Sequence, residues 1–323
     1  MAITLSCAFA TSNTSHEHAR VAENLGYSRA WFYDSPALYP DVWVQLCRAA
    51  ERTSRIGLGP GVLVPSLRHP MVNAAAIATL VSIAGAERIA VGIGSGFTGR
   101  LTLGQRPMKW SSVREYVGVL KTLLRGEQAE WEGGVLQMLH PTGYCVSRPI
   151  EVPFVIAAAG PKGIAAAREV GDGVFAGGMP VSDFPWSIAL TLGTVLKEGE
   201  DAGSARALAA AGHGAAVGFH FALENGQLDK IPGGEEWAAA YASVPERLRH
   251  LALHDQHLIA INQRDRRFVT GDVLAKQGLA LSPAGWRERL ATLESLGATE
   301  IAYQPAGPDI ARELEAFATA VGV

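Results

Sequence analysis

The chain has 323 residues, of which 48% are apolar and 18% are charged, so it can bury a large core and is too apolar for a disordered protein. Its formal net charge of -3 and the absence of a polybasic segment exclude the electrostatic footprint of a nucleic-acid or membrane-surface protein. No apolar run approaches the roughly 18 residues that are needed to span a bilayer. We therefore expect a globular protein with a small-molecule partner.

Cysteine usage and the first residues indicate the compartment. The three cysteines are odd in number and far apart, which fits unpaired thiols in a reducing compartment better than a disulfide framework. The chain enters a strand pattern at once, without the basic and long apolar segments of a signal peptide. We expect a cytoplasmic protein.

The first third of the chain alternates short apolar strands with helices. Pro70 fits a first helical turn and Gly85 fits a helix end. The expected strands are residues 3–9, 29–33, 56–62 and 89–93, and the expected helices are 15–25, 42–52, 70–84 and a fourth with its apolar stripe over 113–124.

The rest of the chain continues this alternation with two interruptions. Residues 126–153 are irregular, carry turn signals and are expected to contain short strands, and residues 233–281 form a second, mostly helical excursion. The expected strands are residues 154–159, 173–176, 215–222 and 300–304, and the expected helices are 161–170, 185–199, an alanine-rich segment after it, and those that begin at Pro283 and Asp309.

Eight strands that alternate with helices favour an α/β fold in which residues 1–323 form a single (β/α)8 TIM barrel, with insertions after strand 4 (126–153) and strand 7 (233–281). An open, doubly wound sheet with a cap is the alternative. In a barrel the site lies at the carboxyl ends of the strands. That rule brings five segments to one face: Asp34, Gly61 to Pro65, Gly94 to Phe97, Gly160 to Lys162, and Gly177 to Met179.

The segment 57–70 is the most unusual part of the chain. Three glycines and two prolines lie within nine residues of it, a density that is costly in chain entropy and propensity. This segment therefore supplies backbone geometry, and we expect it to be the wall behind a bound ligand.

Two glycine turns that follow successive strands are candidates for a phosphate site. They are Gly160-Pro161-Lys162 and Gly177-Gly178. Glycines expose backbone N–H groups, a helix amino terminus adds partial positive charge, and Lys162 adds a full charge. Ordinary tight turns between strand and helix are the alternative for each turn alone.

Several other patterns do not indicate a site. The glycines at 92, 94 and 96 lack the G-x-G-x-x-G spacing, and Ser95 is not in a G-x-S-x-G turn. His250, His254 and His257 stand at i, i+4 and i+7, yet the zincin pattern is absent, so we expect a solvated or interface helix face and no metal.

The segments Gly59-Pro60-Gly61-Val62 and Arg68-His69-Pro70 resemble the luciferase-like monooxygenase superfamily, especially its methylenetetrahydromethanopterin reductase-like branch. The similarity covers most of the chain. It extends to residues 31–34, 92–96, 114–117, 124–127, 131–133, 160–162 and 286–305.

The resemblance implies a TIM barrel that holds FMN or the deazaflavin coenzyme F420, a homodimer, and a separate flavin reductase if the cofactor is FMN. It also implies a cis peptide at Gly61-Val62 that lies against the cofactor ring. Many deazaflavin-dependent relatives have a histidine where this chain has Ser35. Asp34, Tyr33 or a residue of the 126–153 insertion must then be considered for proton donation.

The favoured hypothesis is an oxidoreductase in which hydride passes between F420 and a small organic substrate. The alternatives are FMN-dependent oxygenation with dioxygen and a non-redox barrel that binds a phosphorylated metabolite. Asp34 and Tyr33 are the expected catalytic residues. The expected cofactor-binding residues are Gly61, Val62, Gly94, Ser95, Gly160, Pro161, Lys162, Gly177 and Gly178.

Overall fold

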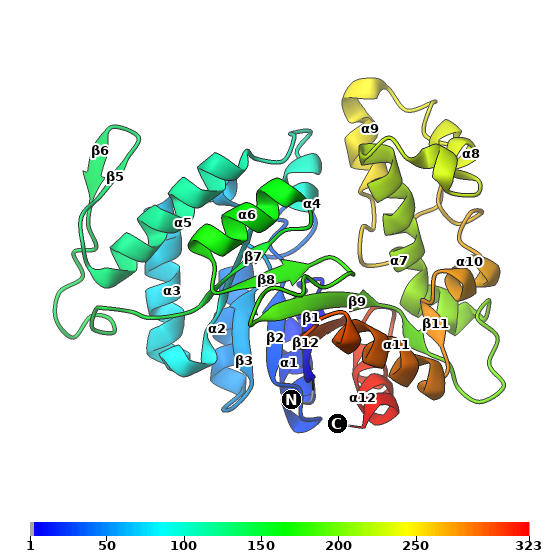
Figure 1. The fold of residues 1–323 in the computed structure, drawn as a ribbon, viewed down its shortest axis with the longest axis horizontal. Coiled ribbons are helices and arrows are strands. Elements are labelled where there is room, and N and C mark those ends of the chain that lie inside the picture. Colours follow the sequence, from blue (N-terminus) through cyan, green and yellow to red (C-terminus); the bar gives the residue numbers. More distant parts are fainter. Residues whose placement is uncertain (1–2, 323) are drawn as a thin grey trace.

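Eight parallel strands form the centre of the computed structural model, which describes residues 3–322 (Figure 1). Their spatial order is β3-β2-β1-β12-β9-β8-β7-β4, so strands that follow one another along the chain are neighbours. They are β1 (Thr4–Phe9), β2 (Arg29–Phe32), β3 (Gly57–Pro60), β4 (Val91–Gly94), β7 (Phe154–Ala157), β8 (Gly173–Ala176), β9 (Ser187–Leu192) and β12 (Glu300–Gln304).

The two ends of this sheet meet at β3 and β4, which closes it into a barrel. The Ala90 amide donates to the Leu58 carbonyl at 3.1 Å. Further across the seam, the Leu63 amide donates to the Gly92 carbonyl at 2.8 Å, and the Gly94 amide donates to the Leu63 carbonyl at 2.9 Å. The prediction of a (β/α)8 barrel is therefore confirmed, and the open sheet is wrong.

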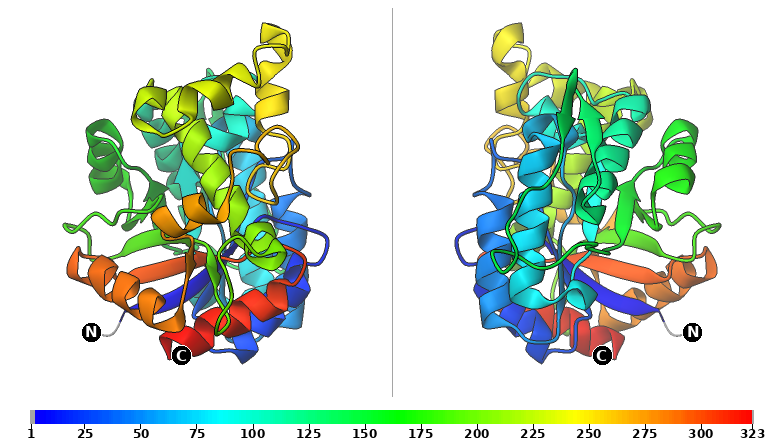
Figure 2. Two further views of the ribbon diagram at one scale, coloured as in Figure 1. Left: turned by 90° about the vertical axis from the view of Figure 1, so that its right-hand side faces the viewer. Right: turned by 90° about the vertical axis from the view of Figure 1, so that its left-hand side faces the viewer.

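Helices surround the barrel and follow its strands in turn (Figures 1 and 2). Their amphipathic stripes pack on the strands, as in α5, whose buried face includes Val113, Tyr116 and Leu120. They are α1 (Ser15–Asn24), α2 (Val42–Arg52), α3 (Pro70–Ala84), α5 (Trp110–Arg125), α6 (Pro161–Val170), α11 (Pro283–Ser295) and α12 (Ile310–Val321). Within the described chain, β8 and β9 are joined by a loop without a helix.

The seventh strand was wrongly placed by the sequence patterns. It is β9, inside the segment that was expected to be a helix over 185–199, and residues 215–222 belong to the long helix α7 (Ala205–Glu224). Both segments are buried apolar runs, and such runs lack the polar positions that distinguish a strand from a helix. The second insertion therefore spans residues 193–282 and includes α7.

This second insertion stands beside the barrel and has helices of its own (Figure 1). Phe219, Trp237, Tyr241 and Leu253 form a small separate core within it. Its elements are β10 (Thr194–Val195), α7, η3 (Leu228–Lys230), α8 (Gly234–Ala239), α9 (Glu246–Leu253), α10 (Gly271–Lys276) and β11 (Ala280–Leu281). The parallel pairing of β10 with β11 returns the chain to the barrel.

The first insertion is a hairpin on the opposite side of the molecule (Figure 1). It contains β5 (Ala129–Trp131) and β6 (Gly134–Leu136), which confirms the expected short strands. Shorter helical segments complete the fold: η1 (Pro65–Leu67), η2 (Ala86–Arg88) and α4 (Phe97–Leu101). Among the described residues, the helices are too short or too polar to cross a bilayer.

The barrel interior is filled by side chains. Trp31 is fully buried there and donates its indole N–H to Glu300 Oε1 at 2.9 Å, while Trp186 donates to Glu300 Oε2 at 2.8 Å. The Arg29 guanidinium lies 5.3 Å from the Trp31 ring. This layer is the floor beneath the carboxyl-end face.

Candidate active site

A cavity of about 250 Å³ opens at the carboxyl ends of the strands. Residues from the ends of β2, β3, β4, β7, β8 and β9 line it together with α4 and one residue of the second insertion. The lining consists of Tyr33, Asp34, Ser35, Tyr39, Gly61, Val62, Val64, Gly94, Ser95, Gly96, Phe97, Thr98, Gly99, Ala157, Phe175, Gly177, Leu190 and Leu258. The cavity is mostly apolar with a few polar groups, as ligand sites usually are.

One wall of this cavity is made of backbone. The Gly61-Val62 peptide bond is cis, as the family resemblance implied. A β-carbon on Gly92 would lie 2.6 Å from the Pro60 carbonyl oxygen and 2.7 Å from Val62 Cγ1, and one on Gly94 would lie 2.9 Å from Val62 Cγ2. The glycines therefore let β4 lie close against Pro60 and Val62 at the end of β3.

Asp34 lies at the end of β2, where it is buried and paired with an arginine. The Arg68 guanidinium donates to Asp34 Oδ2 and, at 2.8 Å, to Asp41 Oδ2. Burial raises the pKa of the Asp34 carboxyl above its ordinary value, and the hydrogen bond and charge of Arg68 counter part of that rise. A carboxyl group whose pKa is raised exchanges protons more readily near neutral pH.

Tyr33 follows β2 and is held by Gln304, the last residue of β12. Its hydroxyl donates to Gln304 Oε1 at 2.8 Å, and the Gln304 amide donates to the Leu258 carbonyl at 2.8 Å. Burial raises the pKa of Tyr33 well above its ordinary value. Tyr33 therefore retains its proton and joins the barrel to the second insertion.

The expected phosphate residues lie at the same end of the barrel, but only one reaches the cavity. Gly177 is part of the lining, whereas Gly160, Pro161, Lys162 and Gly178 are not. Gly160 precedes the first turn of α6, and β-carbons on Gly160, Gly177 and Gly178 would meet no atom within 4 Å. These turns are open, so the phosphate role stays a prediction.

The first insertion contributes no residue to the cavity lining. Its Trp131 packs edge-on against Tyr116 and His69, and the His69 ring nitrogen caps α3 by accepting from the Met71 amide at 3.2 Å. The first insertion thus packs on α3 and α5 and lies outside the cavity lining, and His69 serves as the cap of α3.

The helix face expected for His250, His254 and His257 is wrong. Helix α9 ends at Leu253, so His254 lies at its carboxyl end and His257 lies in the following turn. His254 and His257 are 5% and 4% exposed and pack against His220 of α7. The i, i+4, i+7 spacing suggested one helix because nothing in it marks the helix end.

Sequence reasoning missed several residues around the cavity. Gln304 ends the eighth strand, so a polar residue at a strand end was a usable signal. His220 was overlooked because residues 215–222 were assigned as a strand, and His213 carries no motif of its own. No sequence signal identifies Leu258, which reaches the cavity only through the path of the second insertion.

Comparison of the chain with known proteins identifies its family. The family model described as luciferase-like monooxygenase matches residues 10–300. The chain therefore belongs to the luciferase-like monooxygenase family of oxidoreductases.

Individual relatives agree with this family. The chain is 27% identical over 319 residues to 5,10-methylenetetrahydromethanopterin reductase of Archaeoglobus fulgidus, covering 92% of this chain and 91% of the relative. The fold is similar to that of an F420-dependent secondary alcohol dehydrogenase solved with an F420-acetone adduct (TM-score 0.68, 16% identity, all of both chains). It is also similar to the oxygenating constituent of 3,6-diketocamphane monooxygenase from Pseudomonas putida in complex with FMN (TM-score 0.57, 14% identity, 99% and 98% of the chains).

Proposed function

We propose that the protein is an F420-dependent oxidoreductase that transfers hydride between the deazaflavin and a small organic substrate. The observation that carries this proposal is the wall formed at Gly61 and Val62 around their cis peptide bond, which faces a mostly apolar cavity. A planar ring could lie against such a wall, and β-carbons on Gly92 and Gly94 would collide with Val62 and displace it. When bound, the deazaflavin supplies the hydride chemistry, and the protein supplies binding and orientation.

Each predicted site residue has a role in this proposal. Gly61 and Val62 lie behind the ring, and Gly94 and Ser95 border it at the end of β4. Asp34 holds or releases the proton of the substrate oxygen, because it is the buried carboxyl group in the cavity lining. Tyr33 positions Gln304 and is not itself the acid. The main contribution to rate is then the proximity of donor and acceptor carbons.

The phosphate end of the cofactor is assigned to the open glycine turns. Gly160-Pro161-Lys162 begins α6 and offers free N–H groups and a charged side chain, and Gly177 and Gly178 follow β8. Lys162→Ala should weaken F420 binding about tenfold, or about 1.4 kcal/mol, and leave the thermal unfolding unchanged. Lys230→Ala, in the second insertion, is the matched control, and equal affinity of both variants would mean that the phosphate site is elsewhere.

FMN-dependent oxygenation is the second candidate. The similarity in fold to an FMN-bound oxygenating enzyme supports it, as does Ser35 in the position where many deazaflavin-dependent relatives have histidine. Such an enzyme would also need a source of reduced flavin. The two candidates differ in their need for dioxygen, so they can be separated directly.

The deciding experiment titrates the purified protein with F420 and with FMN while tryptophan fluorescence and visible absorbance are recorded. We expect F420 to bind and to be reduced by a secondary alcohol or a related substrate under anaerobic conditions. Tight FMN binding with substrate-dependent oxygen uptake would overturn the F420 proposal. Phosphate affinity without binding of either cofactor would indicate the non-redox barrel.

A further inference from the structure

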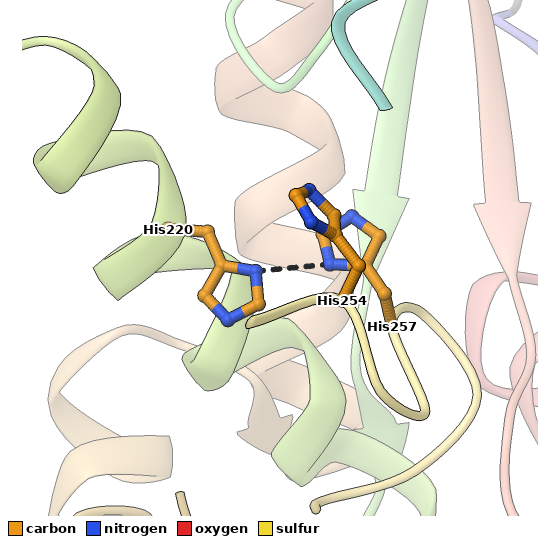
Figure 3. Close-up of side chains that lie close together, drawn as sticks. All are labelled: His220, His254 and His257. Atoms are coloured by element: carbon orange, nitrogen blue, oxygen red, sulfur yellow. Dashed lines mark hydrogen bonds between the residues drawn. The ribbon is translucent and has the colours of Figure 1, made fainter. Parts of the chain in front are cut away.

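Three buried histidines converge outside the cavity lining, in the second insertion. His220 comes from α7, and His254 and His257 come from the end of α9 and the turn after it (Figure 3). One ring nitrogen from each lies within 4.8 Å of those of the other two. The ring centroids are 5.0, 5.0 and 5.7 Å apart, so the rings surround a common point.

The outer nitrogen of each ring faces an oxygen atom. His254 Nδ1 is 2.8 Å from the His250 carbonyl, and His257 Nε2 is 3.3 Å from Thr98 Oγ1. His220 Nε2 is buried without a hydrogen-bond partner among the described residues, and Asp265 Oδ2 lies 3.9 Å from it. Oxygen partners such as those of His254 and His257 fix the tautomer of metal-binding histidines and turn their free lone pairs toward the ion.

Asp265 is itself held in place. Its Oδ1 accepts the Trp237 indole N–H at 2.6 Å and the Tyr241 hydroxyl at 2.7 Å, and its side chain is buried. Burial raises the pKa of the Asp265 carboxyl above its ordinary value, and these two hydrogen bonds counter part of that rise. A carboxylate behind an imidazole is the arrangement that strengthens that imidazole as a ligand.

The inner nitrogens of two rings are in close contact. His220 Nδ1 and His257 Nδ1 are 3.0 Å apart, a separation at which two lone pairs repel unless a proton or a cation lies between them (Figure 3). A divalent cation would satisfy the inner lone pairs together.

We propose that His220 Nδ1, His254 Nε2 and His257 Nδ1 bind one divalent transition-metal ion, with zinc as the reference ion. Tetrahedral zinc holds nitrogens at about 2.0–2.1 Å, which separates them by about 3.3–3.4 Å. His220 Nδ1 and His257 Nδ1, at 3.0 Å, must therefore separate slightly, while the His254 nitrogen, which lies within 4.8 Å of the other two, is brought to the ion by a small shift or a ring rotation. Three protein ligands leave one coordination position for water.

The surroundings give this ion an access route. His254 also lines a separate surface cavity of about 550 Å³, together with Leu251, Asp255 and Gln256. The ion would tie α7 to the turn that carries Leu258, a residue of the cavity lining. Its role is therefore to fix the part of the active site that the second insertion supplies.

The first test uses the full chain and the metal alone. After dialysis against a chelator, the protein is titrated with Co²⁺ and then with Zn²⁺. We expect one Co²⁺ per chain, visible absorption bands of a four-coordinate ion, and their loss when Zn²⁺ replaces Co²⁺. Absence of stoichiometric binding would overturn the proposal, because it would leave a proton as the bridge between His220 and His257.

X-ray absorption of the zinc-loaded wild type identifies the ligands without any substitution. Three imidazole ligands and one oxygen ligand are expected. A coordination shell with sulfur, or with oxygen alone, would place the metal elsewhere and overturn the proposal.

Substitutions then assign the three histidines. His220→Ala, His254→Ala and His257→Ala should each weaken Co²⁺ binding at least 100-fold, and Asp265→Asn should weaken it about 10–100-fold. His250→Ala is the matched control, because it retains the carbonyl that His254 contacts and should bind Co²⁺ like the wild type. Circular dichroism of the metal-free variants checks folding, and a folded variant that binds Co²⁺ normally would remove that residue from the site.

Discussion

The cavity is bounded by two regions that are built differently. At β3 and β4 the wall is backbone, held by hydrogen bonds across the barrel seam and by glycines that leave no space for a β-carbon. At Leu258 the boundary is a side chain carried on the 193–282 insertion, which packs around its own small core. We therefore expect the first region to share the stability of the barrel and the second to open locally without unfolding the barrel.

The largest expected effect tests whether the insertion is an independent unit. Trp237→Ala should cost about 3–5 kcal/mol within the insertion, because it removes a fully buried ring from the small core. Hydrogen exchange should rise in α7 to α9 and stay slow in β1 and β12. Trp286→Ala, in the barrel core, is the matched control and should destabilise the whole molecule. Uniform loss of protection in the Trp237 variant would show that the two regions unfold together.

A second substitution tests the rigidity of the backbone wall. Gly92→Ala should lower the free energy of unfolding by about 1–3 kcal/mol, since its β-carbon would overlap Pro60 and Val62. Gly118→Ala is the matched control. Gly118 is exposed on α5, where alanine should raise stability by about 0.5–1 kcal/mol. Urea unfolding measures the stability of both variants. Equal stability of the Gly92 variant and the wild type would mean that the backbone of β3 and β4 moves to accommodate the β-carbon.

The insertion should also respond to acid. Burial lowers the pKa of His213 to about 4 from an ordinary value of 6.5. Between these two pKa values the His213 ring is protonated in the unfolded chain and neutral in the folded chain. The free energy of unfolding therefore decreases as the pH falls from 6.5 toward 4. At about 1.4 kcal/mol per pH unit, His213 accounts for about 2 kcal/mol between pH 7 and pH 5. Urea unfolding at both pH values measures this effect. The decrease in the free energy of unfolding from pH 7 to pH 5 should be smaller in His213→Gln than in the wild type by that amount. Equal decreases in the two proteins would contradict a buried neutral His213.

The smallest effect concerns the link between the two regions. Tyr33→Phe removes the hydrogen bond to Gln304 and should cost about 1 kcal/mol in thermal unfolding. Because Tyr33 is a positioning residue in our proposal, kcat should fall much less than in Asp34→Asn. Tyr144→Phe, at a residue that is 83% exposed, is the control and should change neither quantity. A loss of activity in Tyr33→Phe equal to that in Asp34→Asn would make Tyr33 catalytic.

The sequence predicted the first six barrel strands because short apolar runs there are separated by amphipathic helices and glycine or proline boundaries. It failed at β9 and α7, where consecutive buried residues give neither a period of two nor one of 3.6. The prediction of the cavity wall and the missed histidine cluster differ in how far apart in the sequence the residues lie. The glycines and prolines of the wall are visible in the short segment 57–65, whereas His220 and His257 meet only through the tertiary path of the insertion.

The absence of β-carbons along the wall has a consequence for altering specificity. Substitutions at Gly61, Gly92 or Gly94 should destabilise the protein, since every other residue introduces a β-carbon within 3 Å of Trp31, Pro60 or Val62. Leu190 and Leu258 line the same cavity with side chains that can be exchanged. The close packing at the seam of the barrel thus limits substitution on that side of the cavity. Variants with altered specificity should therefore be sought at side-chain positions such as Leu190 and Leu258.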